Sequence, residues 1–438
     1  MRLLSLILLL VSLAGAQENI VELSILHFND FHARLLPTQG QGGAAYLAAA
    51  IRKERENCPR CLLLSAGDNV QGTPVSTIFR GLPIFEVLRE FHADAYTLGN
   101  HEFDYGYDRI NDFVAAAGVP ILSANFLTPT GTLFTGQAST IIERDGLRIG
   151  IVGALMEDLV PTLEAPSKIG ANQLLSTLPA IRDEGARIKD KTDILIALVH
   201  LWKLRADQIV TDLKDFSVTV SGHDHAGMTE PFRAEDRIGV RVRSYGLELG
   251  RLDLRYDKVN RKIVDAKWKR IPINTADFAP DAAVSAVVTR WENKVKAVVD
   301  TPVGESKAAK DKAQTKLWLE KVMKESTGAR FVLMNLGGVR DTIPQGQLLA
   351  RHLWNIMPFD NMLVTGQVPG RLIPDFIRGS ESLEPDTLYS LATIDFLVEG
   401  WKAGKDPVLQ ELGRRMPLEG PLFRDVMVDY VQRKKIIE

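Results

Sequence analysis

The sequence predicts an α/β protein with two domains, and three observations lead to this prediction. The chain has 438 residues, which exceeds the ~250–300 residues at which a single hydrophobic core stops growing. In its first half, short apolar segments typical of buried strands alternate with segments of helical periodicity. Several strand-like segments end directly in Asp, Asn or His, at the edge where ligands gather in α/β sheets.

Five apolar segments have the composition of buried β-strands. Each is short, rich in Leu or β-branched residues, and bounded by Gly, Asn, Asp or His. In chain order they read ELSILHF, CLLLSAG, DAYTLG, DILIALV and SVTVSG. Helical segments such as LPIFEVLREFH and DRINDFVAAAG lie between some of them. This alternation predicts an α/β core.

The N-terminus has the pattern of a secretory signal peptide. Arg2 precedes the apolar stretch LLSLILLLVSL, and small residues follow at Ala14-Gly15-Ala16. A membrane anchor is the alternative, but the apolar stretch is shorter than the ~20 residues that span a bilayer. We therefore expect cleavage after Ala16 and export to a periplasm or the medium. The C-terminal KKIIE gives no sign of a lipid anchor, so we expect no membrane attachment after cleavage.

Net charge and cysteine content narrow the classes of function that the sequence allows. The formal net charge of −2 gives no electrostatic reason to expect a nucleic-acid partner or a membrane surface. The two cysteines, Cys58 and Cys61, stand in CPRC, and an exported protein favours a structural disulfide between them. A redox-active pair usually follows a strand and opens a helix, whereas this pair follows a helical segment. Zinc binding is disfavoured because no second Cys or His pair lies nearby.

The polar residues that follow the five strands are of metal-ligand types. Taken singly, most of them are ordinary turn residues. Taken together, they supply oxygen and imidazole donors without thiolate, a set that suits Zn, Mn, Fe or Co. Five of the eight histidines stand at strand ends, whereas His27, His92 and His352 lie in apolar-periodic segments and are assigned structural roles. The candidate metal ligands are Asp30, His32, Asp68, Asn100, His200, His223 and His225.

A lone Asp68 between paired donors is the natural bridging carboxylate for two metals ~3.5–4 Å apart. Such a pair can hold a hydroxide for in-line attack on phosphorus and can stabilise the non-bridging oxygens as charge develops. The donor set accepts several divalent ions, so the sequence leaves the metals open among Zn, Mn and similar ions.

The motifs DFH, GD, GNHEFD, ALVH and GHDH stand in the order found in the calcineurin-like metallophosphoesterases. More narrowly, ILHFNDFHARL, LLLSAGDNVQGT, TLGNHEFDYG and PILSANF resemble the secreted 5′-nucleotidase family. The resemblance covers residues 21–272 well. It implies a four-layer α/β/β/α metallophosphoesterase sandwich, followed by a smaller α/β C-terminal substrate domain.

The resemblance also implies a role for each residue of the site. Asp30, His32 and His225 would hold one metal, Asn100, His200 and His223 the other, and Asp68 would bridge them. His101, paired with Asp104, would stabilise the transition state and protonate the leaving oxygen, because a carboxylate at the far ring nitrogen orients the imidazole and favours its protonated form. Glu102 is expected to be a local structural acceptor.

Beyond the metal motifs, residues 239–273 alternate as a β-hairpin does, and residues 279–300 have helical periodicity. The resemblance implies that this helix links two domains; an ordinary packed helix is the alternative. It further implies that Asn335 and Arg340 bind substrate, Arg340 through a phosphate oxygen edge, and that Phe359 and Phe396 stack on a nucleobase. Without the resemblance, Arg340 would be read as a surface ion-pair residue and the two phenylalanines as core residues.

The chain departs from the family pattern at three places. Leu201-Trp202 follows His200 where the family often has a small residue, so the rim of the site is expected to be more crowded. Lys402 stands where the family has a ribose-binding Asp. The segment SKAAKDKAQTKLWLEKVMKE lacks the recognisable opening of the second domain, with its further phosphate-binding Arg. The second domain is therefore interpreted as shortened or drifted.

The leading hypothesis is an exported phosphoesterase with two divalent metals that hydrolyses a small phosphate ester, a nucleotide, as a 5′-nucleotidase or related enzyme. One alternative is a thiosulfohydrolase of the same family that acts on a carrier-linked sulfur group. Another is a binding protein with a degenerate site. The sequence does not specify an oligomeric state. The predicted boundaries are a signal peptide at 1–16, a metallophosphoesterase domain at 17–272, a linker helix at 273–300 and a substrate domain at 301–438.

Overall fold

The computed structural model describes residues 19–157 and 169–438, so the predicted signal peptide at 1–16 lies outside the described residues. The described chain divides into two compact units. Unit 1 comprises residues 19–70, 81–157 and 169–289, and unit 2 comprises residues 71–80 and 290–438. The division falls inside helix α10 (Ala282–Val299), within the stretch whose periodicity predicts a helix.

Unit 1 contains two six-stranded sheets within the described residues. The first has the order β14-β13-β1-β2-β3-β4, and the second has the order β11-β12-β10-β9-β7-β6. The strands of the first sheet are β1 (Ile20–Phe28), β2 (Leu62–Ser65), β3 (Ala95–Thr97), β4 (Ile121–Leu122), β13 (Glu248–Asp257) and β14 (Lys262–Pro272). Those of the second are β6 (Ser139–Arg144), β7 (Leu147–Leu155), β9 (Ile194–His200), β10 (Val218–Gly222), β11 (Phe232–Ala234) and β12 (Arg237–Val240).

The five strands expected from the sequence are β1, β2, β3, β9 and β10. In the first sheet, β1, β2, β3 and β4 run parallel, and in the second, β7, β9, β10 and β12 run parallel. Parallel strands in one sheet end on the same edge, so every loop that follows one of the five strands leaves from a carboxyl edge. The predicted hairpin is also present, because β13 and β14 pair antiparallel after β12.

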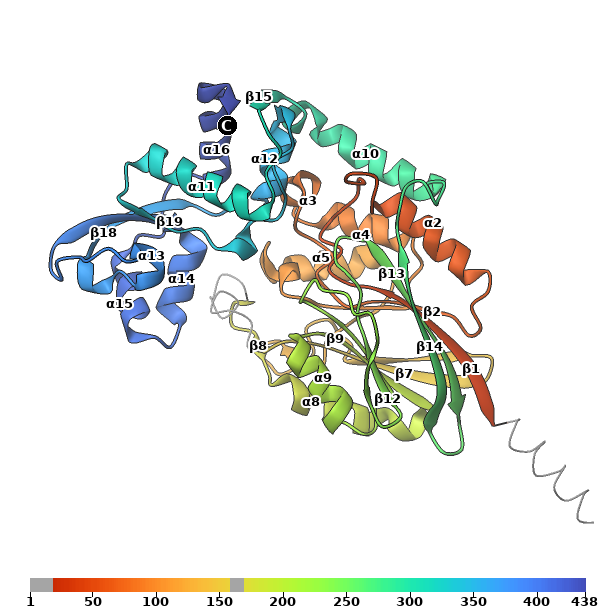
Figure 1. The fold of residues 1–438 in the computed structure, drawn as a ribbon. Helices are drawn as coiled ribbons and strands as arrows, with labels where there is room; N and C mark the ends of the chain where they lie inside the picture. Colours follow the sequence, from red (N-terminus) through yellow and green to blue (C-terminus); the bar gives the residue numbers. More distant parts are fainter. Residues whose placement is uncertain (1–18, 158–168) are drawn as a thin grey trace, which may run out of the picture. The chain divides into compact units, whose positions relative to one another are not determined.

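The two sheets pack face to face around one apolar core. Side chains that alternate along β1, β2, β7 and β9 meet there, including Leu23, Ile25, Leu64, Ile151 and Ile196, each completely buried. In Figure 1, helices lie on the two outer faces. On the first sheet these are α2 (Ala44–Arg55), α4 (Leu82–Arg89) and α5 (Arg109–Ala117), and on the second α8 (Thr177–Ile188) and α9 (Lys203–Asp212). This is the predicted four-layer α/β/β/α sandwich.

Local sequence explains where the helices begin and end. Helix α4 has Pro83 in its first turn, where a missing N–H costs nothing. Helix α5 ends at Gly118, which takes the left-handed conformation (φ 66°) that closes many helices. In unit 2, Asp311 and Gln314 form a reciprocal capping box at the start of α11 (Lys312–Thr327).

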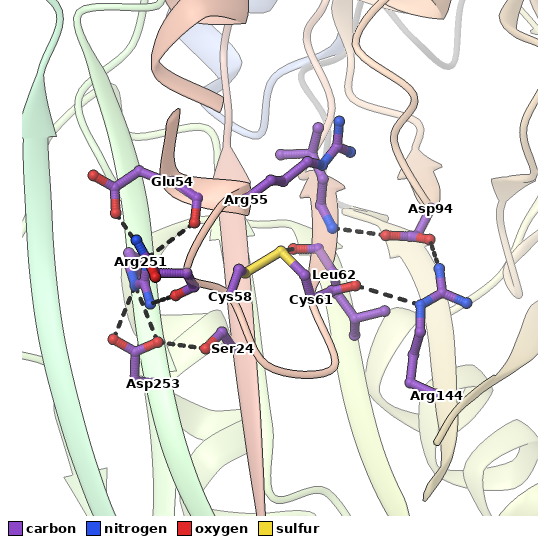
Figure 2. The surroundings of a disulfide bond; sticks show 12 residues. Ser24, Glu54, Arg55, Cys58, Cys61, Leu62, Asp94, Arg144, Arg251 and Asp253 are labelled. Atoms are coloured by element: carbon purple, nitrogen blue, oxygen red, sulfur yellow. Dashed lines mark hydrogen bonds and ion pairs between the residues drawn. A yellow bond between two sulfur atoms is a disulfide. The ribbon is translucent and has the colours of Figure 1, made fainter. Parts of the chain in front are cut away.

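Cys58 and Cys61 form the predicted disulfide, with their Cα atoms 5.0 Å apart. Figure 2 shows that the bond closes the short connection between α2 and β2, between two groups of ion pairs. On one side Arg251 binds Glu54 (2.9 Å) and Asp253 (2.9 Å). On the other, Arg144 pairs with Asp94, whose carboxylate also accepts from Leu63 N (2.8 Å). The disulfide therefore fastens a connection that other contacts already hold.

Unit 2 is a smaller α/β unit with two three-stranded sheets in its described part. One has the order β17-β15-β20 and the other β16-β19-β18. The strands are β15 (Pro302–Ser306), β16 (Phe331–Val332), β17 (Gly346–Leu349), β18 (Leu363–Pro369), β19 (Leu388–Ile394) and β20 (Ile436–Ile437). The helices beside α11 are α3 (Pro74–Ile78), α12 (Ala350–Ile356), α13 (Asp375–Arg378), α14 (Asp395–Ala403), α15 (Pro407–Arg415) and α16 (Phe423–Lys434).

Unit 2 has apolar clusters of its own, one around Trp318, Leu353 and Phe423 and another around Val364 and Trp401. Across the described residues of both units, helices with the length and hydropathy of a membrane span are not found.

Candidate functional site

The candidate site of unit 1 lies where strands of both sheets end. Strand β1 leads to Asp30 and His32, β2 to Asp68, and β3 to Asn100. From the second sheet, β9 ends on His200, and β10 leads to His223 and His225. Five of these seven residues have a left-handed backbone, namely Asp30 (φ 50°), His32 (φ 48°), Asp68 (φ 52°), His223 (φ 96°) and His225 (φ 58°). Such conformations are uncommon outside glycine and cluster at functional sites.

The first group of donor atoms comes from Asp30, His32, Asp68 and His225, and all four atoms lie within 4.8 Å of one another. The Nε2 atoms of His32 and His225 are 2.9 Å apart. His225 Nε2 is 3.5 Å from an Asp30 carboxylate oxygen. His32 Nε2 is 3.9 Å from Asp68 Oδ2. Two imidazoles and two carboxylates thus converge on one small space.

The second group comes from Asp68, His200 and His223 and meets the same 4.8 Å limit. His200 Nε2 is 3.1 Å from Asp68 Oδ2. The amide oxygen of Asn100 lies 3.2 Å from His200 Nε2 and 3.1 Å from His223 Nδ1. Asn100 therefore adds a neutral oxygen donor, and Asp68 belongs to both groups.

In this buried space, burial and charge pairing shift the pKa values of the donor residues in opposite directions. Burial raises the pKa of Asp30 to about 6, although the charge of His200 opposes the rise. Burial also favours a higher pKa for Asp68, but the charges of His200 and His101 hold its pKa well below the usual value. Burial favours a lower pKa for His200, yet the charge of Asp68 raises that pKa to about 10. The carboxylates therefore need positive charge beside them in order to ionise.

The residues present fit divalent cations. Imidazole nitrogens that face each other at 2.9 Å require a proton or a cation between them, because two lone pairs repel. Carboxylate, imidazole and amide donors without thiolate are ligands of Zn, Mn and related ions. The ring nitrogen of His200 that faces away from the donor group has a hydrogen-bond partner of its own. His200 Nδ1 lies 2.7 Å from the carbonyl oxygen of Ala66, an arrangement that orients many metal-binding histidines.

His101 lies beside both groups without belonging to either. Its Nδ1 is 2.7 Å from Asp104 Oδ2, and its backbone N–H donates to Asp68 Oδ1 at 2.8 Å. Its ring centroid is 5.1 Å from that of His32. The structure therefore brings together the pair that the sequence suggests, at the edge of the donor groups.

Glu102 is the local hydrogen-bond acceptor that the sequence suggests, and its position lets it connect two loops of the site. Its fully buried carboxylate accepts from the backbone N–H groups of Gly99 (2.6 Å), Asp68 (3.1 Å) and Asn69 (2.7 Å). It therefore fastens the loop after β2 to the loop after β3. The sequence signal is its place directly after Asn100-His101.

Sequence reasoning missed Asn29 and Tyr245. Asn29 Nδ2 donates to Asp30 Oδ2 (2.7 Å) and to the carbonyl of Val242 (3.0 Å), so it orients the Asp30 carboxylate. The Tyr245 ring lies 5.5 Å from His32 and 5.3 Å from His225, centroid to centroid. Asn29 adjoins Asp30, which could have indicated it, whereas nothing local marks Tyr245.

The residues expected to bind substrate lie in unit 2 and are described separately. Asn335 follows β16 and begins a short 3₁₀ turn. The guanidinium of Arg340 is 5.8 Å from the centre of the Phe359 ring, so the structure brings these two together. Phe396, at the start of α14, is partly buried and packs against the core of unit 2. Lys402, which stands where the resemblance would place a ribose-binding Asp, lies in the same helix.

Lys312 is a further residue that sequence reasoning missed in unit 2. Burial lowers the pKa of its ammonium, and the charge of Arg340 lowers it further. Two cations held close together favour an anion beside them. Lys312 stands in the segment where the sequence shows no equivalent of a second phosphate-binding Arg. Residue spacing within that segment gives no sign that Lys312 lies near Arg340.

Comparisons with known proteins agree with this architecture. Residues 23–227 match the family model of the calcineurin-like phosphoesterases, and residues 294–382 match that of the 5′-nucleotidase C-terminal domain. The chain is 23% identical over 493 aligned positions to Endonuclease YhcR of Bacillus subtilis, an alignment that covers 95% of this chain and 40% of YhcR. It is 25% identical over 417 positions to the trifunctional nucleotide phosphoesterase YfkN of the same organism, covering 83% of this chain and 28% of YfkN. The chain thus spans less than half the length of either relative.

Among solved structures, a 5′-nucleotidase precursor from Thermus thermophilus has the same fold. It superposes with a TM-score of 0.84 at 20% identity, covering 95% of this chain and 97% of that one. The two matched family models, one in each half of the chain, show that it belongs to the 5′-nucleotidase family of the calcineurin-like metallophosphoesterases.

Proposed function

We propose that this protein is an exported phosphoesterase that uses two divalent metal ions to hydrolyse nucleotides. The observation that carries the proposal is the sharing of Asp68 between two convergent donor groups, since a bridging carboxylate is typical of two-metal hydrolases. The names of the relatives, nucleotide phosphoesterase YfkN among them, support a nucleotide substrate. The predicted signal peptide supports export, and N-terminal sequencing of the mature protein tests cleavage after Ala16.

The chain's own residues divide the work of such a reaction. When bound, two divalent cations would polarise a phosphoryl oxygen and yield a nucleophile from water at neutral pH. Asp30, His32 and His225 would hold one cation and Asn100, His200 and His223 the other, with Asp68 shared. Asp104 accepts from His101 Nδ1, so the proton that a protonated His101 can deliver lies on Nε2. We assign to that nitrogen the protonation of the leaving oxygen.

For unit 2 we propose substrate recognition. Arg340 and Lys312, two cations close together, would attract the phosphate, and Asn335 would donate a hydrogen bond to the substrate. Phe359 and Phe396 would stack on the base. In this scheme residues 17–272 form the catalytic domain, 273–300 the linker helix and 301–438 the substrate domain.

A substrate screen on metal-reconstituted protein tests the proposal. The apoprotein is loaded with Zn²⁺, Mn²⁺ or Co²⁺ and assayed with 5′-monophosphates, diphosphates, cyclic phosphodiesters, an aryl phosphate and a sulfur ester. We expect release of phosphate from nucleotides, and loss of that activity on chelation or in Asp68→Asn. Asp193→Asn, at a carboxylate that pairs with Arg148 in unit 1 (3.0 Å), is the matched control and should remain active.

Two results would contradict the proposal. Loaded protein that hydrolyses neither the aryl phosphate nor any nucleotide has no such activity. Protein that hydrolyses the sulfur ester in preference to all phosphate esters belongs to the thiosulfohydrolase alternative. Equal activity on the aryl ester and on nucleotides would leave the phosphoesterase in place but would show that Phe359 and Phe396 do not bind a base.

A further inference from the structure

Each donor group of the candidate site has an aromatic ring packed against one or both of its histidines. In the second group this ring is Trp202, whose centroid lies 3.9 Å from that of His223, with the two ring planes at 89°. In the first group it is Tyr245, which lies edge-on to His225 at 5.3 Å (80°) and tilted against His32 at 5.5 Å (46°). All five residues belong to unit 1.

The backbone of Trp202 is held in place from both sides. Leu201, directly before it, is buried (1% exposed). The carbonyl of Trp202 accepts from Arg205 N (2.9 Å) and Ala206 N (3.0 Å), as the first hydrogen bonds of α9. The indole itself remains 46% exposed. A large ring that is fixed at its backbone and packs against a histidine can limit where that histidine turns.

His223 is a residue whose orientation needs such support. Its backbone has φ 96°, a strained value for a residue with a side chain. Among the three members of the second donor group, His223 is half-buried, whereas Asp68 and His200 are buried. Its Nδ1 reaches Asn100 Oδ1 (3.1 Å) and His200 Nε2 (3.3 Å) only in one ring orientation, because rotation about χ1 would carry that nitrogen away.

Tyr245 is fixed in a corresponding way. Its backbone N–H donates to the carbonyl of Asp30 at 2.7 Å, and it also has a left-handed backbone (φ 65°). The guanidinium of Arg34 lies 4.8 Å from the centre of its ring. The ring is thus anchored to a residue of the first group and contacts both histidines of that group.

We propose that Trp202 and Tyr245 are positioning residues: Trp202 holds His223 of one metal subsite in the binding orientation, and Tyr245 holds His32 and His225 of the other. Trp202 supports the subsite of Asn100, His200 and His223, and Tyr245 supports that of Asp30, His32 and His225. The proposal rests on the two-metal function proposed above. It makes the affinities of the two subsites separately adjustable, because the histidine contacts of each ring lie in one donor group.

Metal titration of the apoprotein tests this assignment without reference to activity. Zn²⁺ binding is measured by calorimetry, and the rate of metal loss to a chelator is followed in parallel. Trp202→Ala should weaken one of two sites by about 10-fold and Tyr245→Ala the other by a similar factor, the effect expected when support around a ligand is removed. Trp202→Phe should restore most of the affinity, because a ring is retained.

Variants that retain only one of the two metal subsites show which subsite Trp202 supports. In His225→Asn, which retains the second subsite, adding Trp202→Ala should weaken the remaining site. In His223→Asn, which retains the first subsite, the same addition should have no further effect. Leu204→Ala is the matched control, because Leu204 lies two residues from Trp202 and is 79% exposed. Its metal affinities should equal those of the wild type.

The outcomes separate this inference from the proposed function. Wild-type protein that fails to bind two ions contradicts the two-metal function itself. Wild-type protein that binds two ions, with Trp202→Ala unchanged at both sites, overturns the positioning role and leaves that function intact. Equal weakening of both sites by Trp202→Ala, in a variant whose circular dichroism matches the wild type, also overturns it, because support would then not be specific to one subsite.

Discussion

At the scale of single residues, His101 differs from His200 in what its Nδ1 contacts. Its Nδ1 faces the Asp104 carboxylate (2.7 Å), whereas His200 Nδ1 faces a carbonyl and His200 Nε2 faces Asp68. We predict that His101→Asn retains both metals while kcat falls by ~10²–10⁴-fold, the usual contribution of a general acid. Metal content by elemental analysis and kcat on a nucleotide check this.

A matched variant makes the test of His101 sharper. Asp104→Asn should reduce kcat less, because the ring remains and only its orienting carboxylate is lost. If His101→Asn protein lacks a metal ion, His101 is a metal ligand and its role as the general acid is wrong.

His27 gives a prediction about pH that is independent of the metal site. It is completely buried on β1 and stacks on Trp268, with ring centroids 5.5 Å apart. Neither of its ring nitrogens has a hydrogen-bond partner among the described residues. Burial lowers its pKa to about 3 from the usual 6.5. The unfolded chain therefore binds a proton below about pH 6.5 that the folded chain takes up only near pH 3.

Because the folded pKa of His27 is depressed, its neutral form supports stability above pH 6.5. That support is lost as pH falls toward 3, at up to about 1.4 kcal/mol per pH unit. His27→Phe keeps a ring against Trp268 and removes the titrating group, so its free energy of unfolding should depend less steeply on pH. Urea unfolding of both proteins between pH 7 and pH 4 measures the difference. Parallel curves for the two proteins would contradict the prediction.

At the scale of elements, the disulfide closes a loop of four residues between α2 and β2. Loop-closure entropy for so short a loop stabilises the folded state by about 2 kcal/mol. We predict that the double variant Cys58→Ser, Cys61→Ser folds and binds metal normally, with its free energy of unfolding lower by about that amount. The Arg251 and Arg144 contacts around the loop remain in this variant.

Denaturant unfolding with and without a reducing agent checks the disulfide prediction. The wild-type protein should move to the stability of the double variant when reduced, and the variant should not respond. Lost metal binding in the variant would show that the disulfide supports the site as well as the loop.

Elements with a strong local pattern were predictable from the sequence. The five strands that end in ligands, the α2, α4 and α5 helices and the β13–β14 hairpin follow from apolar periodicity and turn residues. Strand order was not predictable, because β1 pairs with β13 from more than 200 positions along the chain, and such pairing depends on packing rather than on local preference. The sequence predicts no element for segment 395–403, which forms helix α14.

The candidate site was likewise predictable only where the signal in the sequence is local. Asp30, Asp68 and His200 were identifiable because each stands at the end of a buried strand or shortly after it. Their grouping into two clusters that share Asp68 needed the structure, since it depends on how the two sheets meet. Tyr245 and Lys312 were missed because each interacts with a residue distant in sequence, His32 and Arg340 respectively.

At the scale of the whole molecule, the two units have separate apolar cores, and every donor of the candidate metal site lies in unit 1. Ions that bind only the folded state stabilise it by mass action, by ~2.7 kcal/mol per site at 100 times Kd. For a unit of this size, two such sites correspond to a rise in Tm on the order of 10 °C.

We predict that chelation lowers the melting temperature of unit 1 by about that amount and leaves that of unit 2 unchanged. Differential scanning calorimetry with and without a chelator should therefore show two transitions, of which one moves. Asp68→Asn identifies the moving transition, because a protein without the shared carboxylate should show little response to chelator. Equal shifts of both transitions, or none, would contradict the assignment of the metal ions to unit 1.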